Sequence, residues 1–164
     1  AAGGVRWERP SSPVWTTDRW GAEVVGLARR VASGPTRVPV VDSHGDLDRK
    51  NTLRRPDGAL VALDWDAAGP VGAVHEAVAV ALDWADAQPD AFAQAVEAYA
   101  RRSGVIVPAQ PWVFAGWVSG QGGRLDYNAT HRHDTARGDA EVRGALGRLR
   151  RLAERMDALL AALP

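Results

Sequence analysis

Four polar residues between positions 44 and 64 have types and a spacing that suit one reaction. Asp46 carries a carboxylate, which can orient a hydroxyl group and accept its proton. Asn51 and Asp64 supply one neutral and one anionic oxygen, and Mg²⁺ takes a small number of such hard ligands from proteins. A proton acceptor beside a magnesium site is what phosphoryl transfer to a hydroxyl requires. His44 stands at the start of the same stretch.

The residues between Asn51 and Asp64 predict a β-hairpin that brings these two side chains together. Strand-like runs at 52–55 and 60–63 flank Asp57-Gly58, and Asp-Gly between such runs is a strong turn signal. A two-residue loop at Asp57-Gly58 would set Asn51 opposite Asp64, and a three-residue loop would shift the register by one. In either register the turn places an amide and a carboxylate at the same end of one hairpin.

The string His44-Gly-Asp-Leu-Asp-Arg-Lys-Asn51, followed by Leu63-Asp64-Trp65, resembles the catalytic core of the aminoglycoside phosphotransferase and choline kinase-like family. That family has an H-G-D-x-x-x-x-N loop and then a D-[WF] metal-ligand motif, the counterparts of H-R-D and D-F-G in protein kinases. Ala68-Gly69 and Glu76 also stand where members carry these residue types. The resemblance implies a protein-kinase-like C-terminal lobe. Its cofactors would be Mg²⁺ and ATP, or another nucleoside triphosphate, and its acceptor a hydroxylated small molecule.

The family's motifs also imply a role for each residue of this set. Asp46 would be the catalytic base, and Asn51 and Asp64 would bind the nucleotide through its Mg²⁺. His44 belongs to the catalytic loop and would hold that loop in place. Lys50 lies close enough to the acceptor side to touch a phosphate of the cofactor, and a solvated loop charge is an equal alternative.

The acceptor stays open at the level of the sequence. Aminoglycosides are polycationic, but choline, sugars, amino acids and macrolides are alternatives. Carboxylates that later helices offer to a polycation are Asp83, Asp86, Glu97, Asp126 and Asp134. The arginines of the last helix lie mostly off its apolar stripe, so we expect a solvated face rather than a phosphate site there; they are Arg148, Arg150, Arg151 and Arg155.

The N-terminal lobe of such a kinase is not predicted within this sequence. That lobe supplies a glycine-rich loop over the phosphates and a strand lysine. The only lysine here is Lys50, and no G-x-G-x-x-G segment precedes it. We therefore expect a C-terminal lobe that is inactive alone. Its face toward the missing lobe should be exposed and apolar, which favours a homodimer or contact with another chain.

Two other interpretations of the same stretch stay open. Asp42-Ser43-His44-Gly45 is similar to the D-x-H-G opening of metallophosphoesterases, in which Asp and His bind a dinuclear metal centre. The G-D-x-x-D and G-N-H-[DE] motifs that should follow are missing. The second alternative is a non-catalytic, kinase-like binding module, and the intact loop from His44 to Asn51 argues against it.

Composition narrows the class of protein further. The 164 residues include no cysteine, which excludes disulfides and thiolate metal sites and favours a reducing cytoplasm. The formal net charge is +0, so no global charge points to nucleic acid or an anionic membrane. No apolar run approaches the ~18 residues that a membrane span needs. The first residues, Ala1 to Gly4, include neither an initiator Met nor a signal-peptide pattern.

Around this stretch the sequence predicts a single α+β domain over 1–164 that is mainly helical. Residues 1–16 look irregular, and 38–41 predict a short strand. Apolar spacing predicts helices over 17–31, 71–86, 91–102, 108–119 and, after an interruption at 120–123, on to 131. The last helix is predicted by an apolar stripe that consists of Val142, Leu146, Leu149, Leu152, Met156, Leu159 and Leu163.

Overall fold

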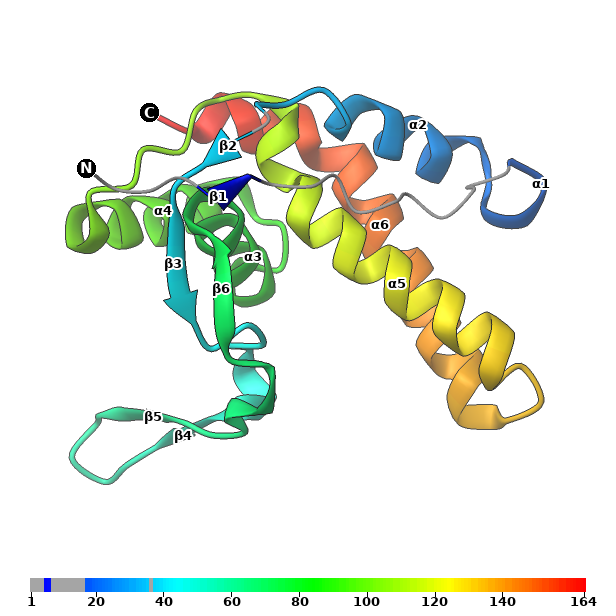
Figure 1. The fold of residues 1–164 in the computed structure, drawn as a ribbon, viewed down its shortest axis with the longest axis horizontal. Coiled ribbons are helices and arrows are strands. Elements are labelled where there is room, and N and C mark those ends of the chain that lie inside the picture. The colour runs from blue at the N-terminus through cyan, green and yellow to red at the C-terminus, as the bar shows by residue number, and fades with distance from the viewer. Residues whose placement is uncertain (1–4, 7–16, 36) are drawn as a thin grey trace.

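The computed structural model describes residues 5–6, 17–35 and 37–164, and in this part the chain is mainly helical with short antiparallel strand pairs (Figure 1). This agrees with the predicted α+β class. The α-helices are α1 (Thr17–Trp20), α2 (Ala22–Val31), α3 (Ala73–Ala85), α4 (Pro89–Ser103), α5 (Ala115–His131) and α6 (Ala136–Ala162). The strands are β1 (Val5–Arg6), β2 (Arg37–Val38), β3 (Val40–Ser43), β4 (Thr52–Arg54), β5 (Leu60–Ala62) and β6 (Gly69–Gly72). Three 3₁₀ turns complete the described part: η1 (Arg49–Asn51), η2 (Trp65–Ala67) and η3 (Pro111–Phe114).

The core forms where α6 packs against α5, α4 and α2. α6 begins after Thr135, whose side chain accepts a hydrogen bond of 3.0 Å from the N–H of Gly138 and so caps the helix. The predicted apolar stripe of α6 is buried at Leu149, Leu152, Met156, Leu159 and Leu163. Within the described residues, no helix is both long and apolar enough to cross a membrane.

Strands β3 and β6 pair antiparallel, with Val40 opposite Gly72 and Ser43 opposite Gly69. Residues 44–68 therefore leave the body at the end of β3 and return to the same place. Within this excursion β4 and β5 form the predicted hairpin, which projects away from the helices (Figure 1). The helix predicted from residue 71 begins only at Ala73, because residues 71 and 72 belong to β6.

Two further predictions of local structure are corrected. The helix predicted over 17–31 is divided at Gly21, whose φ of 90° lies in the left-handed region. The predicted interruption at 120–123 is wrong, because α5 runs unbroken through these residues. Glycine in a helix interior costs only about 1 kcal/mol relative to alanine, and packing of α5 on α6 outweighs it. Of the segment predicted to be irregular, Val5 and Arg6 pair with β2, and 1–4 and 7–16 lie outside the described residues.

His75 on α3 is the buried polar residue around which α3 and α5 pack. Its Nδ1 lies 3.3 Å from the carbonyl oxygen of Val113, and its ring meets Trp112 edge-on at 5.8 Å between centroids. Burial lowers the pKa of His75, and the bond to Val113 offsets this only in part. Gly116 on α5 makes the close approach possible, since a Cβ there would lie 2.8 Å from the Cβ of His75.

We predict opposite effects of alanine at two glycines of α5. Gly116→Ala should lower the free energy of unfolding by about 1–3 kcal/mol, because its methyl group would overlap His75. Gly123→Ala should raise it by up to about 1 kcal/mol, since a Cβ there meets nothing within 4 Å and alanine is the better helix former. Urea denaturation of both variants tests this. Equal effects would mean that α3 and α5 are not in tight contact at His75.

Candidate functional site

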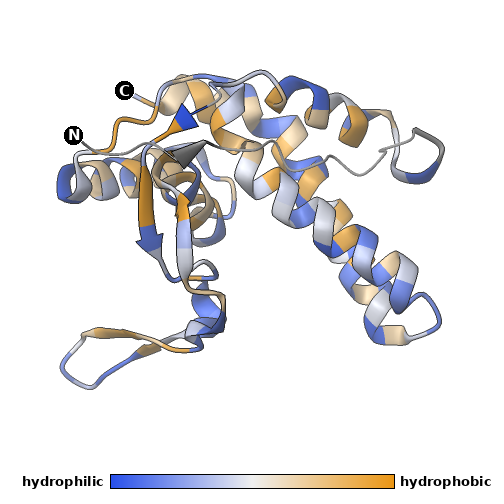
Figure 2. Ribbon diagram, viewed as in Figure 1, coloured by the Kyte–Doolittle hydropathy of each residue, from blue (hydrophilic) through white to orange (hydrophobic). Residues whose placement is uncertain are grey.

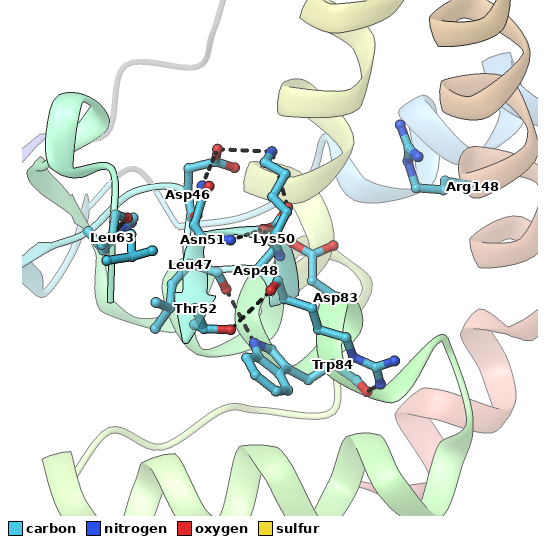
Figure 3. Close-up of polar contacts among 12 residues, drawn as sticks. Asp46, Leu47, Asp48, Lys50, Asn51, Thr52, Leu63, Asp83, Trp84 and Arg148 are labelled. Carbon is cyan, nitrogen blue, oxygen red and sulfur yellow. Dashed lines mark hydrogen bonds and ion pairs between the residues drawn. The ribbon is translucent and has the colours of Figure 1, made fainter. Parts of the chain in front are cut away.

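The loop from His44 to Asn51 is held by its own side chains. Asp48 accepts hydrogen bonds from the backbone N–H groups of Lys50 (2.9 Å) and Asn51 (3.1 Å), and this cap fixes the turn η1. Lys50 Nζ lies 3.2 Å from Asp46 Oδ2 and 3.1 Å from Asp48 Oδ2. The lysine therefore joins two carboxylates of the loop (Figure 3).

Asp46 is positioned through one of its two carboxylate oxygens. Asn51 Nδ2 donates to Asp46 Oδ2 at 3.0 Å and to the Asp46 carbonyl oxygen at 2.8 Å, and Lys50 approaches the same Oδ2. No side chain of the described residues donates to Asp46 Oδ1. This oxygen is therefore the atom left to meet a ligand. Desolvation lowers the pKa of Lys50, but its hydrogen bonds to Asp48 and Asp46 and their charges outweigh this, so the net shift is upward and Lys50 is charged at neutral pH.

His44 ties the loop to the far strand of the hairpin. The side chain is buried, and its Nε2 lies 2.6 Å from the carbonyl oxygen of Leu63. The ring also lies against Trp65, with 4.7 Å between centroids. These contacts hold the start of the loop against Leu63 and Trp65. They also connect the loop to both residues that flank Asp64.

Gly45 is needed where the loop meets the turn after Asp64. Its φ is +75°, and a Cβ at this position would lie 2.4 Å from the carbonyl oxygen of Ala67. Any larger residue would force these two segments apart. This explains in physical terms why glycine stands between His44 and Asp46.

Asn51 and Asp64 lie at the same end of the hairpin, as predicted, in the alternative register. Thr52 pairs with Ala62, so the loop has three residues and Asn51 is opposite Leu63, whose N–H donates to the Asn51 carbonyl at 2.9 Å. Asp64 follows this pair with a left-handed backbone (φ 59°), and its side chain is exposed.

The side chains of Asn51 and Asp64 each leave oxygen atoms without a partner among the described residues. The amide nitrogen of Asn51 is committed to Asp46, and its oxygen accepts no hydrogen bond from the described residues. The carboxylate of Asp64 likewise has no hydrogen bond or ion pair within this part of the chain. One amide and one carboxylate oxygen, with water for the remaining positions, suit Mg²⁺. No three His, Asp or Glu residues converge within the described residues, which gives the dinuclear alternative at Asp42 and His44 no support.

A pocket of about 430 Å³, called here the central pocket, opens beside Asp46 between the loop, α3, α5 and α6. Trp117 Nε1 donates to Asp83 Oδ1 at 3.0 Å on its wall. Solvent reaches Asp83 through the pocket, yet desolvation by the surrounding protein raises the pKa of this carboxyl group, and the charges of Asp48 and Asp46 add to the rise. The hydrogen bond from Trp117 and the charge of Arg148 oppose the shift only in part. The lining of the central pocket includes Asp46, Asp83, Trp117, Gly120, Arg124 and Arg148.

Trp84 on helix α3 holds the loop in place, and the sequence does not identify it as a residue of the site. Its Nε1 donates to the carbonyl oxygen of Leu47 at 3.3 Å, and its own carbonyl accepts from Arg49 Nη2 at 2.6 Å (Figure 3). Arg148 was also missed as a site residue, because it was assigned to a solvated helix face. It is only partly exposed, and it lines the central pocket.

Hydrophobic residues occupy much of the projecting hairpin (Figure 2), and several of the apolar side chains in and beside it are exposed. Leu53 is 57% exposed, Leu60 61% and Trp65 59%, and Val61 and Leu63 are also exposed. Of the seven large hydrophobic residues exposed in the described part of the chain, these five lie between positions 53 and 65. Such a concentration of apolar surface is typical of a face that another chain segment or partner covers.

No family model, curated protein or solved structure matches this chain.

We predict that Gly45→Ala weakens the fold more than Gly58→Ala. Both glycines have positive φ, so alanine at either should cost about 1–2 kcal/mol of backbone strain. Only the Gly45 variant would also overlap the Ala67 carbonyl, which should add about 1–3 kcal/mol. Chemical denaturation measures the difference. Equal losses would show that the loop and the turn after Asp64 are not locked together.

We predict that Asp83→Asn stabilises the protein at pH 7. The raised pKa means that the folded state disfavours the ionised carboxyl group, so the stability linked to its proton is lost as the pH rises through the folded pKa. Asn retains an oxygen for Trp117 and carries no charge. The advantage should vanish below the ordinary value of 3.8, where the carboxyl group is protonated in both states. Denaturation at pH 7 and below pH 3.8 tests this, and an advantage independent of pH would contradict it.

Proposed function

We propose that this chain is the catalytic lobe of an ATP-dependent phosphotransferase, which moves the γ-phosphate to a hydroxyl group of a small molecule. One observation carries the proposal: Asp46 is fixed through Oδ2 by Asn51 and Lys50 and stands on the wall of a pocket large enough for a small molecule. The resemblance of the sequence from His44 to Trp65 to the aminoglycoside phosphotransferase and choline kinase-like family supports it independently.

In this proposal Asp46 orients the acceptor hydroxyl and takes its proton on Oδ1 as the oxygen attacks phosphorus. Asn51 contributes in two ways in this proposal, because its amide nitrogen holds Asp46 and its oxygen would be available to a cation. Asn51 and Asp64 would hold Mg²⁺, which supplies charge neutralisation on the phosphates. The left-handed backbone at Asp64 adds support, since such conformations of non-glycine residues cluster at functional sites.

In this proposal Lys50 orients the catalytic loop rather than a phosphate of the nucleotide. Its ammonium group is held between Asp46 and Asp48, so it keeps the catalytic carboxylate oriented and offsets the repulsion between the two acids. His44 contributes by fixing the loop to Leu63 and not by touching the reactants.

In this proposal the nucleotide site is completed by a second lobe. Lys50 is the only lysine of the sequence, and it is engaged by two carboxylates. A strand lysine for the phosphates and a cover for the adenine would come from an N-terminal lobe on the exposed apolar hairpin. Until that face is covered, Mg·ATP has few contacts.

We therefore predict weak binding of Mg·ATP to the 164-residue chain, in the millimolar range or about 4 kcal/mol, without measurable phosphotransfer. Calorimetry and ¹⁵N NMR titration measure it. Asp64→Ala should abolish the magnesium-dependent part of the binding, and Asp46→Asn should leave it within about twofold. In a protein that carries both lobes, Asp46→Asn should cut turnover by at least about a hundredfold, because Asn cannot accept the proton.

Three results would count against this function. Binding that is insensitive to Asp64→Ala would remove the metal site, and near-normal turnover of Asp46→Asn would remove the base. Turnover that is absent even with both lobes, at intact Mg·ATP binding, would favour a non-catalytic binding module.

Micromolar binding with turnover by the 164-residue chain would show that it completes a nucleotide site alone.

A further inference from the structure

The walls of the central pocket carry opposite charges. The loop and α3 bring carboxylates to one side, and α5 and α6 bring guanidinium groups to the other. Figure 3 shows Arg148 apart from the loop residues, with no interaction joining it to them. A ligand in this pocket therefore meets both signs of charge. The kind of ligand that the pocket binds depends on whether the carboxylates or the guanidinium groups still lack partners.

The carboxylates that line this pocket already have donors. Asp46 and Asp48 share Lys50, Glu76 accepts a hydrogen bond from the hydroxyl of Ser43, and Asp83 accepts one from Trp117. Each of these carboxylates thus has at least one donor before a ligand arrives. A polycation would have to compete with Lys50 for Asp46 and Asp48.

The two arginines are in the opposite situation. Arg148 uses only Nε, which donates to Gln121 Oε1 at 2.8 Å, and its Nη2 is buried without a hydrogen-bond partner in the described residues. Arg124 makes no side-chain hydrogen bond or ion pair within the same part of the chain. Asp83 forms no ion pair with Arg148. A buried cationic donor without an acceptor is costly, and a ligand oxygen with negative charge would relieve that cost.

The electrostatics of this wall agree with the geometry. Desolvation lowers the pKa of Arg148, and the charge of Arg124 nearby lowers it further, while the charges of Glu141 and Asp83 oppose this shift only in part. Two guanidinium groups that repel each other on one wall of a pocket gain from a shared anion, and planar guanidinium groups suit carboxylate and phosphate oxygens.

The lining of α5 leaves room for such a group. A Cβ at Gly120 would meet nothing within 4 Å, and Gly120 faces the same pocket one turn before Arg124. The glycine that the sequence suggested would break the helix thus leaves space beside the arginines. An aliphatic side chain there would fill the pocket without displacing any protein atom near its Cβ.

We propose that Arg124 and Arg148 bind an anionic group of the acceptor, a carboxylate or a phosphate monoester, while its hydroxyl group meets Asp46. That the bound molecule is a phosphate acceptor rests on the proposed function. The anion site itself does not depend on phosphotransfer. It narrows the open list of acceptors to hydroxylated anions and disfavours polycations.

Binding of four sugars to the 164-residue chain tests the proposal without ATP. Glucuronate and glucose 6-phosphate carry the two candidate anions on matched frames, and glucose and glucosamine are the neutral and cationic controls. In ¹⁵N NMR titrations, we expect one or both anions to shift the Arg148 Nε–H resonance and the backbone amides near Gly120. Glucose and glucosamine should bind at least tenfold more weakly. Whichever anion binds identifies the group, and preferred binding of glucosamine would overturn the proposal.

Variants locate the site. Arg148→Gln and Gly120→Leu should each weaken anion binding at least tenfold, the first by removing the charge and the second by filling the pocket. The matched controls are Arg143→Gln, an exposed arginine of the same helix, and Gly123→Leu, a glycine of α5 outside the pocket, and both should bind within twofold of the parent. The Gly120 variant keeps the test valid if Arg148→Gln does not fold.

The failure of this proposal and that of the proposed function can be told apart. Anion binding that Arg148→Gln and Arg143→Gln reduce equally reflects net charge alone and overturns the site. Phosphotransfer to a neutral or cationic acceptor that is unaffected by Arg148→Gln leaves the function standing and also overturns the site. Anion binding at Arg148 without phosphotransfer in a two-lobed protein supports the site and refutes the function.

Discussion

The antiparallel pairing of β3 with β6 is the constraint on which the candidate site depends. Because Ser43 lies opposite Gly69, the residues between them must leave the body and return to one point. The two halves of this excursion then meet at the Leu63 carbonyl, which His44 contacts, and at the Ala67 carbonyl, which approaches Gly45. The proposed base, metal ligands and lysine all lie within this closed segment, so one backbone pairing sets their mutual arrangement.

The pairing of β3 with β6 is also the part of the fold that could not be predicted from the sequence. The hairpin is local: Asp57 Oδ1 accepts from the N–H of Ala59, and this is turn chemistry that can be recognised from sequence. Strand β6 is Gly-Pro-Val-Gly, a composition with low strand propensity, and its partner lies far away in the chain. The sequence does not choose between the two hairpin registers, because loops of two and of three residues both suit Asp-Gly and only the Arg55–Ala59 pairing decides between them.

Helix periodicity explains why the last helix was predicted well and its arginines were not. The spacing of Leu149, Leu152 and Met156 identifies the buried face of α6 without reference to any other element. The spacing does not show what the residues beside that face meet. Arg150 pairs with Glu23 at 2.8 Å, as expected for a solvated face, whereas Arg148 borders a pocket whose other walls come from α3, α5 and the loop. Only the tertiary arrangement separates these two arginines.

The central pocket shows the pattern expected of a site that meets a ligand rather than one optimised for stability. Desolvation disfavours the charged forms of both Asp83 and Arg148: it raises the pKa of Asp83 and lowers that of Arg148. A purely structural pair of this kind would gain by closing into an ion pair, yet these two groups remain apart across open space. By contrast, Asp46 is fixed by two donors before any ligand binds. Groups held in place at some cost to folding, around a pocket that stays open, are what electrostatic preorganisation requires.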